Sequence, residues 1–176
     1  PAQQGDTDIV KLSKIGTGLG TYSGNAITSH AMDIGPDGQM YVLDYIGNLF
    51  TADLTTGLAT FIVATNPANE NAMDIVFDDA GKLFVVGNSK LYTVNTANGS
   101  VSEVGALSVA DDIMGVWSDS SGQLYGTSYA TPGKFYSINK STAALTELSG
   151  TAGNRPHGGD LWIAYDGGGV NSAPTL

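Results

Sequence analysis

The chain has 176 residues and a formal net charge of −10, and this length suffices for one domain with a packed core. Its seven Lys and Arg residues exclude the broad basic face that binding to nucleic acid or to an anionic membrane requires. The absence of cysteine excludes disulfides, thiolate metal sites and a cysteine nucleophile.

The composition favours strands joined by turns, because the chain holds 24 glycines, many Thr, Ser, Asn and Asp residues, and few helix formers. No stretch approaches the roughly 20 apolar residues of a membrane-spanning helix, so we expect no membrane insertion. The sequence begins at Pro1 without a signal-like segment, which predicts a processed chain or a domain cut from a longer one.

The first predicted strand covers residues 10–16 of "VKLSKIGTG". Its apolar residues Leu12 and Ile15 match Val101 and Val104 of "VSEVGA", a later segment of the chain. We therefore expect this strand to form the outer edge of the last unit of the repeat described next.

Three segments with one plan then follow, at 31–64, 72–106 and 113–150. Asp33 and Asp74 are 41 residues apart, as are Asp74 and Gly115. A fourth start appears in "GGDLWIAYDG", where Asp160 lies 45 residues after Gly115. Each complete unit holds four short apolar runs, such as Met32–Ile34, "QMYVLD", "NLFTAD" and "LATFIVA" in the first.

Four antiparallel strands in about 40 residues, repeated along a chain, are typical of β-propeller blades. A β-solenoid and a sandwich are the alternatives, but solenoid coils are usually shorter and sandwiches do not repeat. We predict an all-β propeller domain over residues 1–169, with 170–176 as a linker or tail. It would have three complete blades and a composite fourth, formed by the fourth start and the strand at 10–16. Such closure removes open sheet edges; alternatively, two chains join into a larger ring.

The first strand of each propeller blade lines the central channel, so residues at one register converge at its mouth. Three positions before Asp33, Asp74, Gly115 and Asp160 stand four polar residues, which we predict as candidate metal ligands: His30, Asn71, Asp112 and His157. They include both histidines of the chain. Imidazole suits transition metals and oxygen donors suit Ca²⁺, so the expected cofactor is calcium or another divalent metal.

Just inside this ring, Asp33, Asp74 and Asp160 are the candidate ligand-binding residues. The alternative is that these carboxylates hydrogen-bond the neighbouring blade, since buried polar groups need partners. The turns "PDG", "DDAG", "DSSG" and "DGGG" lack the alternating oxygen ligands of a calcium-binding hand. We attribute their aspartates to turn formation.

The recurring "G-x-L-Y" pattern is carried by three segments, namely Gly38–Tyr41, Gly81–Phe84 and Gly122–Tyr125. It resembles the blade repeats of bacterial extracellular propellers, including streptogramin-lyase and gluconolactonase-like proteins. The tail "VNSAPTL" resembles the linker before a cadherin-like domain in large acidic adhesins. This resemblance implies a secreted or cell-surface protein.

We therefore expect an extracellular, non-enzymatic binding module for a carbohydrate, a peptide or a surface ligand. A metal-dependent hydrolase or lyase of the propeller type is the second hypothesis, and a structural or oligomerisation module is the third. The expected assembly is a monomer or a ring-completing homodimer, without a nucleic-acid partner.

Overall fold

The computed structural model describes residues 19–27, 29–65, 71–108, 112–148 and 150. Within these ranges every helix or strand element is a strand, arranged as three four-stranded antiparallel sheets and one two-stranded hairpin. This confirms the prediction of an all-β fold built from four-stranded blades. In the same ranges, no helix has the length and apolar character needed to cross a membrane.

Each blade is a meander whose strands pair in chain order. Blade 1 contains β3 (Ser29–Ile34), β4 (Met40–Asp44), β5 (Asn48–Ala52) and β6 (Ala59–Ala64). Blade 2 contains β7 (Ala72–Phe77), β8 (Leu83–Gly87), β9 (Lys90–Val94) and β10 (Val101–Ala106). Blade 3 contains β11 (Ile113–Ser118), β12 (Leu124–Ser128), β13 (Phe135–Ile138) and β14 (Leu145–Glu147). The hairpin before blade 1 consists of β1 (Thr21–Tyr22) and β2 (Asn25–Ala26).

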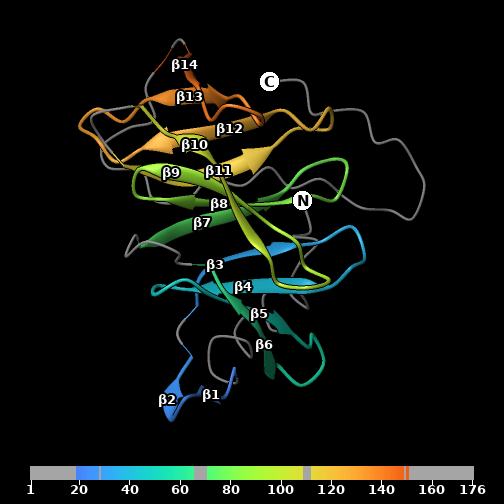
Figure 1. Cartoon of the computed structure of the whole chain (residues 1–176). Helices are drawn as coiled ribbons and strands as arrows, with labels where there is room; N and C mark the ends of the chain where they lie inside the picture. The colour runs from blue at the N-terminus through green and yellow to red at the C-terminus, as the bar shows by residue number, and fades with distance from the viewer. Residues whose placement is uncertain (1–18, 28, 66–70, 109–111, 149, 151–176) are drawn as a thin grey trace, which may run out of the picture.

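The blades lie side by side in chain order, with the hairpin beyond blade 1 at one end of the stack (Figure 1). The inner strands β3, β7 and β11 contact one another in sequence. Because blade 2 is covered on both faces, its strand β8 is buried throughout, which explains the near-continuous apolar run "LFVVG".

The apolar residues of each strand divide between two layers, as the alternation of side chains in a strand requires. Leu83 and Val85 belong to the core between blades 1 and 2, whereas Phe84 and Val86 belong to the core between blades 2 and 3. A single strand thus stabilises two junctions between blades.

The turns joining the first and second strands fit against the preceding blade. Gly81 and Gly122 have positive φ angles of 75° and 72°, a region that glycine adopts without strain. A Cβ at Gly81 would lie 2.8 Å from Pro36 Cγ, and one at Gly122 would meet Asp79. These glycines are therefore needed for backbone conformation and for the approach of neighbouring blades.

Strand pairing shows that the 41-residue spacing between Asp33 and Asp74 does not place these two residues at equivalent positions of their blades. Asp33 pairs with Tyr41, whereas the residue that pairs with the equivalent Phe84 is Val76, not Asp74. Asp33 lies five residues before its turn glycine, whereas Asp74 lies seven residues before its own. The prediction that these aspartates share a register is wrong, because the repeat keeps its register at the turn and not at the "AMDI" motif.

The hairpin end of the stack is closed only in part. Leu19 and Ile27 pack with Met40 and Val42 of blade 1, and Tyr22 stacks on Phe61 at 4.4 Å between ring centroids. The inner strand β3 remains exposed on this face, at Met32 and Ile34. The predicted pairing of 10–16 with 160–165 lies outside the described residues.

Candidate functional site

One edge of the three sheets carries the starts of the inner strands and the turns between second and third strands. His30 is on β3, Asn71 immediately precedes β7, and Asp112 immediately precedes β11. We call this edge the mouth edge; it includes the turn at residues 44–48. His157 and Asp160 lie outside the described residues.

Each inner strand contains an irregularity near the mouth edge. The pairing of β3 with β4 shifts between Ser29 and Ala31, so that His30 is the extra residue of a bulge. The same irregularity recurs at Met73 in β7 and at Met114 in β11. His30 is therefore equivalent to these methionines. Asn71 and Asp112 share one position relative to the turn between the first and second strands, and His30 lies two residues closer to that turn.

The structure nevertheless links His30 and Asn71 through a side chain that the sequence analysis missed. Asn71 Nδ2 donates a hydrogen bond of 2.9 Å to the Tyr45 hydroxyl. The His30 ring meets the Tyr45 ring edge-on, with 5.2 Å between centroids. Tyr45 is thus held from two neighbouring blades, since Asn71 begins blade 2.

The turn that carries Tyr45 is fixed by buried polar groups. The Asp44 carboxylate accepts hydrogen bonds from the Asn48 backbone N–H (2.7 Å) and from Asn48 Nδ2 (2.8 Å). The backbone N–H and hydroxyl of Thr65 both donate to the Gly47 carbonyl, at 2.6 and 2.9 Å. A turn held in this way has little conformational freedom left to lose on binding.

This rigid turn presents two large side chains to solvent. Ile46 is 64% exposed and Tyr45 is 49% exposed. The corresponding connection in blade 2, between β8 and β9, carries Asn88 and Ser89. The signal in the sequence was an aromatic and aliphatic pair between Asp44 and Gly47, where turn formers are usual.

The inner carboxylates form hydrogen bonds between blades. Asp33 Oδ2 accepts a bond of 2.7 Å from the Phe77 backbone N–H, and Asp74 Oδ2 accepts one of 2.7 Å from that of Val116. Each carboxylate therefore joins its own blade to the next. A ligand-binding role for these residues and for Asp160 stays a prediction.

Of the predicted cation ligands, His30, Asn71 and Asp112 lie at the mouth edge, each at the start of a different inner strand. Among the residues that the structure describes, no group of three or more His, Cys, Asp or Glu side chains is close enough to hold a metal ion. The predicted ring contains an asparagine and also His157 from outside these ranges, so the metal site stays a prediction.

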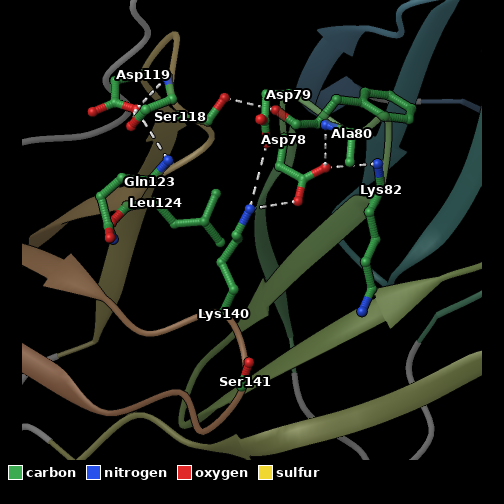
Figure 2. A network of polar contacts seen from close by, with 12 residues as sticks. Asp78, Asp79, Ala80, Lys82, Ser118, Asp119, Gln123, Leu124, Lys140 and Ser141 are labelled. Carbon is green, nitrogen blue, oxygen red and sulfur yellow. Dashed lines mark hydrogen bonds and ion pairs between the residues drawn. The ribbon is translucent and has the colours of Figure 1, made fainter.

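The opposite edge carries the aspartate turns (Figure 2). Asp119 Oδ1 accepts hydrogen bonds from the Ser121 and Gln123 backbone N–H groups, and Oδ2 accepts one from the Tyr125 hydroxyl. Burial alone would raise the pKa of Asp119, but the hydrogen bonds from Ser121, Gln123 and Tyr125 outweigh it and the pKa is lowered. These contacts confirm that Asp119 serves turn formation.

No model of a known protein family and no curated protein matches the chain. Among solved structures it is similar to a catalytically inactive virginiamycin B lyase from Staphylococcus aureus, solved with quinupristin, with a TM-score of 0.62 and 15% identity over 78% of this chain and 47% of the lyase. A chain of the nidogen/laminin complex gives a TM-score of 0.60 and 16% identity over 76% of this chain and 52% of that one.

A third similar structure is the extracellular domain of a protein assigned to the hybrid two-component systems of Bacteroides thetaiotaomicron. Its TM-score is 0.51 with 17% identity, over 73% of this chain and 18% of that one. The chain therefore spans about half the length of the first two structures and less than a fifth of the third. The lyase and the nidogen/laminin chain are β-propellers, and this chain is a propeller-repeat protein. At such identities the likeness extends to the fold alone.

Proposed function

We propose that the chain is an extracellular, non-enzymatic binding module that contacts a carbohydrate, a peptide or a surface ligand through the mouth edge. The observation that carries this proposal is the rigid, solvent-facing pair Tyr45 and Ile46. Aromatic side chains held in place before binding are typical of residues that dominate the energy of an interface. The hydrogen bonds that Asp44 accepts, and those that Thr65 and Asn71 donate, hold the turn in place and so lower the entropic cost of binding.

The similar structures support an extracellular binding role without defining the ligand. One of them is a nidogen/laminin complex, and another is an extracellular domain. A propeller-repeat protein with an exposed aromatic turn at one edge is consistent with binding a partner and with an extracellular location.

Selection against a random peptide library and a glycan array tests the proposal. For any binder recovered with the wild-type protein, Tyr45→Ala and Ile46→Asn should each weaken binding at least about tenfold, the loss of a contact worth roughly 1.4 kcal/mol. Leu58→Asn is the matched control, because Leu58 is also a largely exposed apolar residue but lies between β5 and β6, at the opposite edge. Binders that tolerate both mouth variants, or that are lost with Leu58→Asn, would contradict the proposal.

The proposal extends to a divalent cation held at the mouth by His30, Asn71, Asp112 and His157. Their imidazole, amide and carboxylate groups are suitable ligands for Ca²⁺ or a transition metal. A cation that binds only the folded chain must stabilise it, by about 2.7 kcal/mol at 100 times the dissociation constant. We therefore expect Ca²⁺ or Zn²⁺ to raise the melting temperature of the wild-type protein, and EDTA to reverse the increase.

The double variant His30→Ala/His157→Ala is the test of the ligands. It should melt at the same temperature with and without the cation that stabilises the wild type. An identical stabilisation of the double variant would place the cation elsewhere, and no stabilisation of the wild type by either ion would end the metal proposal.

A further inference from the structure

Blade 3 ends the described stack with an aromatic face that is only half-buried. This face carries Trp117 on β11, Tyr125 on β12 and Phe135 on β13. The Trp117 ring stacks on Tyr125 at 5.8 Å between centroids and meets Phe135 edge-on at 6.2 Å. All three retain partial solvent exposure.

The equivalent face of blade 2 is fully buried. Counting from the turn glycines, Val76 is equivalent to Trp117 and Phe84 to Tyr125, and strand pairing makes Leu91 equivalent to Phe135. All three blade 2 residues are at most 4% exposed, because blade 3 packs on them. The three aromatic residues of blade 3 therefore occupy positions that, in blade 2, are covered by the next blade.

Tyr41 of blade 1 shows what such a strand contributes. Its hydroxyl donates to Asp37 Oδ2 at 3.2 Å, and its ring lies 4.8 Å from the ring of Phe77, the last residue of the next inner strand. Tyr125 repeats the first half of this arrangement, since its hydroxyl donates to Asp119 Oδ2 at 3.1 Å.

The sequence supplies a counterpart for Phe77. Phe77 lies four residues before its turn glycine, Gly81, and Tyr165 lies four residues before Gly169 of "DGGG". By the same count Ile163 is equivalent to Ile75, which packs with Tyr41 in the core between blades 1 and 2. This alignment is counted from the turn glycine of each unit. It differs by two residues from the alignment of Asp160 with Gly115 that the repeat spacing predicted.

We infer that residues 160–165 of this chain dock on the aromatic face of blade 3 as the next inner strand, with Tyr165 against Tyr125. The connection is long enough, because twelve residues separate Glu147 from Asp160, whereas six separate Ala106 of β10 from Ile113 of β11. An inner strand at this position would cover the aromatic face of blade 3, as blade 3 itself covers the equivalent face of blade 2.

Cross-linking tests this inference, since the chain has no cysteine and only introduced thiols react. The full chain with Tyr125→Cys and Tyr165→Cys should form an intramolecular cross-link with a short bismaleimide at least about tenfold faster than the chain with Leu58→Cys and Tyr165→Cys, because proximity raises the effective concentration of the second thiol. Cross-linked dimers in place of the intramolecular product would show that a second copy covers the face. Equal rates in the two variants would show that the segment does not dock there.

Tryptophan fluorescence gives a second readout that keeps Tyr125 intact. In a Trp162→Phe background Trp117 is the only tryptophan. Replacing Tyr165 with Asp should shift its emission to longer wavelength, whereas Asn171→Asp in the tail should leave the emission unchanged. An unchanged spectrum in the Tyr165→Asp chain would overturn the inference.

Discussion

Replacing Asp74 with alanine is expected to lower the free energy of unfolding by about 3 kcal/mol. The Asp74 carboxylate accepts hydrogen bonds from the backbone N–H groups of Ile75 (2.9 Å) and Val116 (2.7 Å). Without the carboxylate, the N–H group of Ile75 in blade 2 and that of Val116 in blade 3 lose this acceptor. The cost is roughly 1–3 kcal/mol for each group that water does not reach. Urea denaturation monitored by tryptophan fluorescence measures the change.

Asp53→Ala is the matched control for this prediction. Asp53 also accepts two backbone hydrogen bonds, from Thr55 and Thr56, but it is exposed and water replaces the carboxylate there. The loss of Asp53 should therefore lower the free energy of unfolding far less than the loss of Asp74. If the two variants were equally stable, Asp74 would not connect blades 2 and 3 in the way described.

Replacing Lys140 with methionine is expected to lower the free energy of unfolding by about 2 kcal/mol. Lys140 Nζ lies 2.8 Å from Asp78 Oδ2, and the Asp78 side chain is only 4% exposed (Figure 2). Removing one partner of a buried ion pair costs roughly 3–5 kcal/mol. The expected loss is smaller because Lys140 is 33% exposed and Asp78 keeps the N–H groups of Ala80 and Lys82.

The control for Lys140→Met is Lys134→Met. The ion pair of Lys134 with Glu147 is about half exposed on both sides, and such surface pairs are worth about 0–1 kcal/mol. Equal losses in the two lysine variants would contradict the assignment of Lys140 to a junction between blades 2 and 3.

The Lys140 contact also predicts a dependence on alkaline pH. The hydrogen bond to Asp78 raises the pKa of Lys140 above its ordinary value. A raised pKa means that the stabilisation is complete below the unfolded pKa of about 10.4 and is lost as the pH rises through the folded pKa. The difference in stability between the wild type and Lys140→Met should therefore shrink above about pH 10.5.

The repeat could be predicted from the sequence because every blade alternates apolar runs with glycine turns. The segments beginning at Gly38, Gly81 and Gly122 were enough to define the second strands, which the structure confirms. The relative register of the inner strands could not be predicted, because "AMDI" occurs in blades 1 and 2 at positions two residues apart relative to the turn.

The candidate site was less predictable than the fold for a related reason. A bulge places His30 where blades 2 and 3 have Met73 and Met114, and spacing alone does not reveal an extra residue in a strand. Tyr45 was missed because it belongs to a turn, and its importance depends on contacts with His30 and Asn71, which are distant in the sequence.

The central claim, that ligands bind at the mouth edge through Tyr45 and Ile46, is tested most directly by backbone amide NMR. The ¹⁵N-labelled protein would be titrated with the tightest peptide or glycan from the selection. We predict chemical-shift changes centred on residues 44–48, together with His30 and Asn71, and none at the opposite edge around Asp78 and Asp119. Changes centred on those aspartate turns, with residues 44–48 unaffected, would contradict the proposed binding site.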